Sequence, residues 1–332
     1  MSLSNPFSSF ALGKTSTPML ELASFKGHVA LVTGGGSGLG KTISLTLAHL
    51  GATVIIAGRR THVIEATAKE INNSAIISSL ESSIRGRVVP LNCDIRDEQS
   101  VSLLFEAIEK EVGKPSIDLL VNNAAGNFIS PTERLNAKGF KAIIDSVLLG
   151  TINVTLCAAK RSISAALIEK SRFEKSTAAD KSFHGLNIVN ILATYAPEGS
   201  AYVVPSAVSK SGCYALTKSL AAEWGIKYGF RINAVSPGPI KTDGAFSRLD
   251  PTGRFEKIML SRIPSKRLGE KEELANLVSY LLSPYSSWMT GQCIVLDGGD
   301  SLVERGMFNE LKAVTEKEWD EMRKVTESVF KK

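Results

Sequence analysis

Short apolar runs alternate with stretches of helical periodicity from residue 27 to about residue 300. The runs that predict strands are HVALVTGG, ATVIIAGRR, RVVPLNCDI, SIDLLVNNAAG, LNIVNILAT, FRINAVSPGPI and QCIVLDGG. Helical stretches such as GLGKTISLTLAHLG lie between them. Because strand and helix alternate, the pattern predicts a Rossmann-like α/β fold, a doubly wound parallel sheet with helices on both faces. The strand cores are continuously apolar, which is typical of strands buried on both sides.

Three segments depart from this alternation. Residues 1–25 are rich in Ser and Thr, with Lys14 as the single base and no Arg, so they predict either a flexible arm or a transit segment. Residues 169–186 carry seven charges without apolar periodicity, which predicts a solvated loop. The charged tail over 304–332 has a helical pattern. The chain therefore divides into an arm (1–25), one domain (26–303) and a C-terminal helical extension (304–332).

The tail begins its last helix with a capping pattern. Thr315 is followed three residues later by Glu318, the spacing of a capping box. Trp319, Met322 and Val325 then recur on one helix face. Such an apolar stripe predicts packing against the domain or against a sister subunit.

The composition narrows the class of protein. The chain has 332 residues, of which 43% are hydrophobic and 22% charged, an ordinary globular composition. Its formal charge is +6, from 39 basic and 33 acidic residues, and the bases form no long run. A mild surplus of this kind favours a small polyanionic ligand over nucleic acid. No apolar stretch approaches the roughly 18 residues of a membrane span, so no membrane insertion is expected.

The cysteines and histidines favour no metal chemistry. Cys93, Cys157, Cys213 and Cys293 are widely spaced and form no CxxC pair, and the histidines accompany no motif. We therefore expect no metal site and no disulfide framework. Reduced cysteines favour an intracellular compartment.

A glycine-rich turn, TGGGSGLG, follows the first predicted strand and opens the first predicted helix. Glycines let the backbone approach a pyrophosphate, and the helix N-terminus favours its negative charge. The strand–turn–helix context therefore predicts a nucleotide-binding site. The cofactor-binding residues predicted in this turn are Gly34, Gly36, Ser37, Gly38, Leu39 and Gly40.

The residues after the second strand choose between the two nicotinamide cofactors. An acid there would accept the ribose hydroxyls of NADH, but this sequence has Arg59 and Arg60 and no acid. Because a guanidinium can pair with a 2′-phosphate, the sequence predicts NADPH. The alternative is that both arginines merely face water. Asp94, after the third strand, is placed to meet the adenine, and Asn123 follows the fourth strand.

These motifs together resemble the short-chain dehydrogenase/reductase family over about residues 27–300. The resemblance rests on the glycine turn, NNAAG, a Pro-Gly pair at a strand end and a lysine in the following helix. The family normally places Tyr four residues before that lysine, but here Ser206 precedes Lys210 and Tyr195 stands upstream. The Asn usual in DSVLLGT is replaced by Val147. Ser and Tyr have exchanged places, which argues against an ordinary alcohol dehydrogenase or ketoreductase.

The exchange and several long strings are similar to the mitochondrial-type 2,4-dienoyl-CoA reductases of this family. The strings are NNAAGNFISPTERL, GPIKTDGAFSRLDPTGRFEK, RIPSKRLGEKEELANL and GMFNELKAVTEKEWD. The resemblance implies NADPH-dependent reduction of 2,4-dienoyl-CoA to 3-enoyl-CoA in the β-oxidation of unsaturated fatty acids. It also implies a homotetramer and a mitochondrial location, with the cytoplasm as the alternative. The chain shows no secretory segment, and its last residues, FKK, are not a peroxisomal signal.

The resemblance also implies roles for single residues. Tyr195 and Asn127 would donate hydrogen bonds to the thioester oxygen. Lys210 would hold the nicotinamide ribose, and Ser206 would order the site. The residues that would cover the nicotinamide are Pro237, Gly238, Pro239 and Ile240. Those that would contact the acyl-CoA substrate are Arg59, Arg96, Phe128 and Arg248.

Other interpretations stay open at this point. The same scaffold could reduce another enoyl- or ketoacyl-CoA thioester, or serve as a non-catalytic NADP-binding sensor. The joint presence of Asn127, Tyr195, Ser206 and Lys210 argues against the sensor. Tyr202 and Tyr214 lie nearby as rival phenols, and we expect both to serve in packing.

Overall fold

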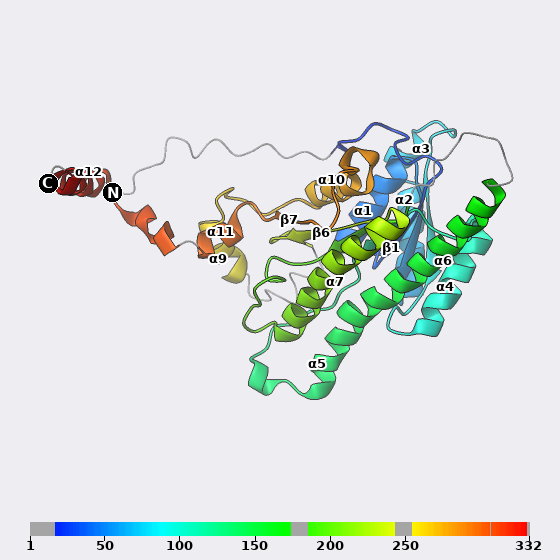
Figure 1. The fold of residues 1–332 in the computed structure, drawn as a ribbon, viewed down its shortest axis with the longest axis horizontal. Coiled ribbons are helices and arrows are strands. Elements are labelled where there is room, and N and C mark those ends of the chain that lie inside the picture. Colours follow the sequence, from blue (N-terminus) through cyan, green and yellow to red (C-terminus); the bar gives the residue numbers. More distant parts are fainter. Residues whose placement is uncertain (1–16, 174–184, 243–253, 306, 331–332) are drawn as a thin grey trace.

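The computed structural model describes residues 17–173, 185–242, 254–305 and 307–330. A parallel seven-stranded sheet runs through the domain in the order β3-β2-β1-β4-β5-β6-β7 (Figure 1). The strands are β1 (Val29–Thr33), β2 (Thr53–Gly58), β3 (Arg87–Asn92), β4 (Leu119–Asn122), β5 (Asn187–Ile191), β6 (Arg231–Pro237) and β7 (Cys293–Leu296). Each strand lies within one predicted apolar run, so the predicted fold is confirmed.

Helices cover both faces of this sheet. The main ones are α1 (Gly38–His49), α2 (Thr61–Asn72), α4 (Glu98–Val112), α5 (Ala137–Ile143), α6 (Gly150–Phe173), α7 (Val204–Tyr228) and α10 (Lys271–Leu282). The remaining helices are α3 (Ala75–Ser78), α9 (Arg254–Arg262), α11 (Asp300–Arg305) and α12 (Glu316–Phe330). One buried core packs α1, α2 and α10 against the sheet. A second core packs α4, α6 and α7 against its other face.

The strand order reverses direction between β1 and β4, which lie side by side in the sheet. Chain crossovers leave the sheet on opposite sides at such a point and open a crevice at the carboxyl ends of the strands. The buried Thr33 ends β1, and its hydroxyl accepts hydrogen bonds from the backbone N–H groups of Asn123 and Ala124, both at 3.0 Å. The two strand ends that border the crevice are therefore fixed to each other.

The predicted loop over residues 169–186 is partly wrong. Helix α6 continues through Phe173, so residues 169–173 are helical, and residues 174–184 lie outside the described part of the chain. The extension is rich in Glu, Lys and Arg, which are good helix formers and need no apolar face. A search for apolar periodicity therefore missed the last turn of the helix.

The expectation about membrane spans needs a correction as well. The continuous helical stretch Ala137–Ile168 is long and apolar enough to cross a membrane by length and composition, with a mean hydropathy of 1.8 over its most apolar window. Of that window, 44% is buried inside the protein. Core helices of soluble proteins can be equally long and apolar, so the length and composition of this stretch are weak evidence for a membrane segment.

The capping box at the last helix is confirmed. The backbone N–H of Thr315 donates to Glu318 at 2.7 Å, and the N–H of Glu318 donates back to the Thr315 hydroxyl at 3.4 Å. Helix α12 lies away from the sheet (Figure 1). Trp319, Met322 and Val325 are accordingly 43%, 44% and 65% exposed, so the predicted packing on the chain's own domain is not found. Packing against a sister subunit stays a prediction.

Candidate active site

A cleft of about 850 Å³ opens at the carboxyl ends of strands β1 to β4, where the strand order reverses direction. The predicted residues that line it are Gly34, Gly36, Ser37, Arg59, Asp94, Arg96 and Asn123. Arg96, which the resemblance assigned to the substrate, thus shares this cleft with the predicted cofactor-binding residues. Gly38, Leu39 and Gly40 form the first turn of α1 beside it.

The glycines of the turn are required by close backbone approach. A Cβ at Gly40 would lie 2.4 Å from the carbonyl oxygen of Gly34 and 2.5 Å from the Asn123 amide nitrogen. Gly34 has a φ of +67°, and a Cβ there would lie 3.0 Å from the Cα of Ala124. The turn therefore brings bare backbone and the N-terminus of α1 to the cleft wall. This arrangement fits the pyrophosphate of a dinucleotide.

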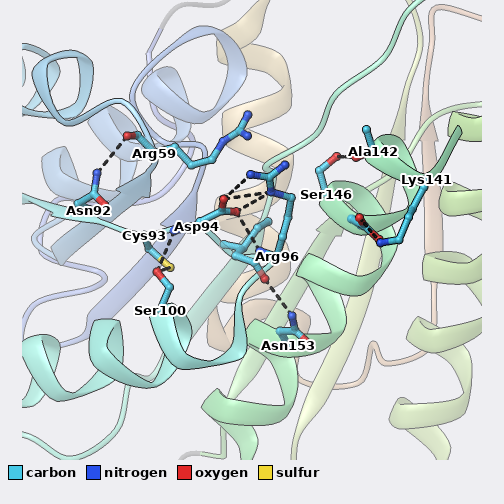
Figure 2. Close-up of polar contacts among 12 residues, drawn as sticks. Arg59, Asn92, Cys93, Asp94, Arg96, Ser100, Lys141, Ala142, Ser146 and Asn153 are labelled. Carbon is cyan, nitrogen blue, oxygen red and sulfur yellow. Dashed lines mark hydrogen bonds and ion pairs between the residues drawn. The ribbon is translucent and has the colours of Figure 1, made fainter. Parts of the chain in front are cut away.

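Charged side chains gather at the β2 and β3 end of the cleft (Figure 2). Asp94 and Arg96 form an ion pair at 2.5 Å, and the Arg96 hydrogen bond is the main reason why the pKa of Asp94 is lowered. Arg59 and Arg60 are exposed, and within the described residues neither guanidinium forms an ion pair or a hydrogen bond. Two arginines are therefore free to meet an anion.

A second group of residues brings Asn127, Tyr195 and Ser206 together. Tyr195 lies on the loop after β5, Ser206 in the first turn of α7, and Asn127 on the loop after β4. The Tyr195 hydroxyl lies 3.0 Å from the Ser206 hydroxyl and accepts a hydrogen bond of 3.3 Å from the Asn127 side-chain nitrogen. The backbone N–H of Phe128 donates to the Asn127 side-chain oxygen at 2.9 Å, which turns the amide nitrogen toward Tyr195.

Burial keeps the Tyr195 phenol protonated. It raises the pKa of Tyr195 above the ordinary tyrosine value, and the hydrogen bond with Ser206 opposes this only in part. A phenol with a raised pKa is a hydrogen-bond donor at neutral pH rather than a base. The arrangement therefore suits stabilisation of a developing oxyanion better than proton abstraction from an alcohol.

Lys210 lies on α7 but is buried, with 7% of its surface exposed. Its ammonium donates to the carbonyl oxygen of Ile191, at the end of β5, at 2.5 Å. Burial lowers the pKa of Lys210. At the position of the usual Asn, the Val147 carbonyl accepts hydrogen bonds from the Thr151 hydroxyl at 2.7 Å and the Cys213 thiol at 3.5 Å. Side chains of the protein thus satisfy that carbonyl.

The residues predicted to cover the nicotinamide lie at the end of β6. Gly238, Pro239 and Ile240 follow Pro237 at the end of β6 and line a cavity of about 160 Å³. The backbone N–H of Gly238 donates to Leu296 at 2.9 Å. Arg248 lies outside the described residues.

The prediction that Tyr202 serves in packing is wrong. Its side chain is 60% exposed, and its backbone has a φ of +63°, in the left-handed region that a bulky residue rarely adopts. Its carbonyl accepts a hydrogen bond of 2.9 Å from the N–H of Ser130. Tyr202 thereby joins the loop that carries Tyr195 to the loop that carries Asn127.

Sequence reasoning missed several residues of the site. Thr33 fixes the two strand ends, and Cys93 and Ser146 line the cofactor cleft. Ser146 lies in a π-helical turn over Ile144–Leu149, between α5 and α6, a geometry frequent at functional sites. A buried polar residue at the carboxyl end of a strand, as in VALVT, was the signal that could have identified Thr33.

The parallel sheet, the glycine turn at its switch point and the half-buried Tyr195 with the buried Ser206 and Lys210 define an oxidoreductase with a nicotinamide-dinucleotide cofactor. The family model described as enoyl-(acyl carrier protein) reductase matches residues 34–301. The chain therefore belongs to the short-chain dehydrogenase/reductase family, as the sequence resemblance implied.

Two similar proteins come from Caenorhabditis elegans. "Probable 2,4-dienoyl-CoA reductase 3 [(3E)-enoyl-CoA-producing]" is 44% identical over 92% of this chain and 90% of its own length. "Probable 2,4-dienoyl-CoA reductase decr-1.2" is 42% identical over 97% of this chain and 96% of its own.

Solved structures give the same fold. A short-chain dehydrogenase from Bacillus anthracis is 34% identical, with a TM-score of 0.65, over 84% of this chain and 98% of its own. A variant of actinorhodin polyketide ketoreductase with NADPH is 26% identical, with a TM-score of 0.69, over 84% of this chain and 98% of its own.

Proposed function

We propose that this protein reduces a 2,4-dienoyl-CoA thioester to the 3-enoyl-CoA with NADPH, a step in the oxidation of unsaturated fatty acids. The observation that carries the proposal is the contact of the Tyr195 hydroxyl with Asn127 and Ser206. The names of the two C. elegans relatives support the choice of substrate.

The directions of the hydrogen bonds indicate what Tyr195 can do. Asn127 donates to the Tyr195 oxygen, and the Ser206 hydroxyl can donate to it as well. The proton of the phenol is then free to point at a substrate oxygen. The Asn127 amide carries a second N–H that is available to the same oxygen. Two preorganised donors can therefore converge on one atom, as stabilisation of an oxyanion requires.

Reduction of a conjugated dienoyl thioester produces such an oxyanion. When bound, the nicotinamide cofactor would supply a hydride for the new C–H bond at the δ-carbon. The electron pair of the γ,δ double bond then shifts through the conjugated system onto the thioester oxygen, where Tyr195 and Asn127 stabilise the dienolate. A proton from water at the α-carbon completes the 3-enoyl product, so two electrons and two hydrogens are added.

We infer NADPH over NADH from the arginines after β2. Arg59 and Arg60 line the cleft, and neither guanidinium is paired within the described residues. A guanidinium is well suited to a 2′-phosphate, and an acid that would bind the ribose hydroxyls of NADH is absent from positions 58–60.

An assay with purified protein tests the proposal. NADPH oxidation and loss of the dienoyl absorbance are followed together on a 2,4-dienoyl-CoA, and the position of the remaining double bond is read by NMR. We expect equal consumption of both reactants and a 3-enoyl product. Faster reduction of a 2-enoyl-CoA or a 3-ketoacyl-CoA, run in parallel, would favour the second reductase activity. NADPH binding without turnover of any thioester would favour the sensor.

The variant Tyr195→Phe tests the role of the phenol. Loss of one oxyanion donor lowers kcat by about 10²- to 10³-fold, while NADPH affinity stays unchanged. Tyr214→Phe is the matched control, because Tyr214 is a half-buried phenol further along α7 that packs against the core cluster containing Leu192 and Cys213, with its ring under Lys218 at 4.5 Å. Full turnover by Tyr195→Phe would refute the assignment.

We further propose that the protein is a mitochondrial homotetramer. The Ser- and Thr-rich segment over residues 1–25 supports the location, and the exposed stripe of Trp319, Met322 and Val325 supports contact with a sister subunit. Light scattering on the purified chain and imaging of a C-terminally tagged chain test the two parts separately.

A further inference from the structure

One carboxylate shares the cofactor cleft with three arginines. Asp94 lines the cleft together with Arg59, Arg60 and Arg96. The Nε of Arg96 lies 2.9 and 3.0 Å from the two carboxylate oxygens, and its Nη2 donates to Oδ2 at 2.5 Å. The backbone N–H of Arg96 also donates to Oδ1 at 3.1 Å. Both oxygens of Asp94 are therefore occupied by the residue two positions further along the chain.

The loop that carries this pair is fixed from two helices (Figure 2). The backbone N–H of Asp94 donates to the Ser100 hydroxyl on α4 at 3.0 Å, and Asn153 on α6 donates to the Ile95 carbonyl at 3.0 Å. Asp145 also attracts Arg96, but it has its own ion pair with Lys141 at 2.6 Å. Arg96 is thus committed to Asp94 in a well-anchored loop.

Arg59 is the other cation that interacts electrostatically with Asp94. Its charge contributes to the lowered pKa of Asp94, after the hydrogen bonds and charge of Arg96. Figure 2 shows the Arg59 side chain extending toward the Asp94–Arg96 pair. Asn92 fixes the backbone of Arg59 by donating to its carbonyl at 3.1 Å, while the guanidinium has no partner in the described part of the chain. Arg59 thus interacts electrostatically with Asp94 but forms no ion pair with it.

We propose that Arg96 is a positioning residue for cofactor selection: by neutralising Asp94 it keeps Arg59 available for the phosphate that distinguishes NADPH from NADH. This inference rests on the use of NADPH proposed above. Without Arg96, an unpaired carboxylate in the cleft would repel that phosphate and would also capture the free guanidinium of Arg59. Both effects weaken the binding of NADPH, and neither weakens the binding of NADH.

Binding titrations without substrate test this. Kd values for NADPH and NADH are measured by the fluorescence of the reduced nicotinamide for wild type, Arg96→Gln and the double variant Asp94→Asn/Arg96→Gln. Because the pair is partly exposed, we expect Arg96→Gln to weaken NADPH by about five-fold and leave NADH unchanged. Removal of the carboxylate in the double variant should restore the wild-type ratio of NADPH to NADH affinity, because any contact of Asp94 with the adenine is common to both cofactors. In an Arg59→Gln background the capture cannot occur, so Arg96→Gln should weaken NADPH binding less than it does in the wild type, through repulsion alone.

Arg87→Gln is the matched control. Arg87 forms an ion pair with Glu111 at 2.7 Å at the opposite end of β3, so the variant changes the net charge equally without touching the cleft. It should leave both Kd values unchanged, and thermal unfolding should show that all variants are folded.

Each other outcome overturns the inference. Equal loss of NADPH and NADH affinity, or no loss, would mean that Arg96 does not select the cofactor. Selective loss that Asp94→Asn fails to restore would mean that Arg96 touches the phosphate itself. A failure of the proposed NADPH use appears separately, because wild type would then bind NADPH no tighter than NADH.

Discussion

Replacing Lys210 by Met should make the folded protein more stable while removing its activity. Lys210 is 7% exposed, and within the described residues its ammonium donates to one carbonyl, that of Ile191, with no carboxylate at ion-pair distance. A buried charge with so little compensation destabilises the fold. Methionine has a similar length and shape and needs no hydration.

The magnitude follows from two opposing contributions. Removal of the buried charge should contribute about 2–4 kcal/mol, by analogy with buried ion pairs replaced by apolar side chains. The Ile191 carbonyl then loses its partner, which costs about 1–2 kcal/mol. From the middle of the two ranges, the free energy of unfolding should rise by about 1.5 kcal/mol, and Tm by about 2–5 °C. Turnover should be lost, because this lysine is the residue proposed to hold the nicotinamide ribose.

The pH dependence gives this prediction a second readout. Burial lowers the pKa of Lys210 in the folded chain, so the folded chain releases this proton at lower pH than the unfolded chain does. Between the two pKa values the unfolded chain binds more protons, and wild-type stability therefore rises with pH. The stability advantage of Lys210→Met should be full below the lowered pKa and shrink as pH rises toward the ordinary lysine value.

Urea unfolding without cofactor at several pH values measures both effects. Lys218→Met is the control, because this exposed lysine lies on the same helix over the Tyr214 ring and should change stability by about 0.5 kcal/mol or less. If Lys210→Met is folded but no more stable than wild type at neutral pH, the reasoning about its buried charge is wrong.

Three further predictions concern the backbone and the phenol. Gly40→Ala should abolish cofactor binding in titrations and cost about 2–4 kcal/mol of stability, because its Cβ would lie 2.4 Å from a carbonyl oxygen. Gly126→Ala is the control and should be tolerated, because a Cβ there would lie 3.5 Å from the nearest atom, the Cδ1 of Ile143. Tyr202→Gly should be about 1 kcal/mol more stable than Tyr202→Ala, since only glycine relieves the positive φ. Because burial raises the pKa of Tyr195, turnover should fall only above the ordinary tyrosine pKa. If turnover falls at a lower pH in the wild type and this fall is absent from Tyr195→Phe, the fall comes from this phenol. Such a result would contradict the role of Tyr195 as a hydrogen-bond donor.

Periodicity predicts the fold well because burial acts on whole strands. All strands of the sheet lie inside apolar runs, since residues buried on both faces leave a continuous signal. The end of α6 has no such signal, because its last charged turn over residues 169–173 needs no apolar face. The sequence therefore predicts that a strand or helix exists where burial requires an apolar pattern, but it does not predict at which residue that element ends.

The site divides in a similar way. The spacing of Ser206 and Lys210 predicts one helix, and both lie on α7. Their separate partners were not predictable: Ser206 contacts Tyr195, whereas Lys210 contacts the end of β5. The pairing of Asp94 with Arg96 and the positive φ of Tyr202 depend on loop conformations that residue types alone do not determine. The sequence thus indicated several of the described residues that lie together, such as Tyr195, Asn127 and Ser206, and left open which of them are in contact.

The exchanged positions of Ser and Tyr fit the different needs of two reactions on this fold, the oxidation of an alcohol and the reduction of a dienoyl thioester. An alcohol dehydrogenase needs a phenol that loses its proton easily, and a phenol one helical turn before Lys210 would lie near the ammonium that favours its anion. Here Tyr195 stands instead on the loop after β5, where burial raises its pKa and Asn127 and Ser206 are its hydrogen-bond partners. A dienolate needs hydrogen-bond donors that stay protonated, so moving the phenol away from the lysine turns a base into an oxyanion donor.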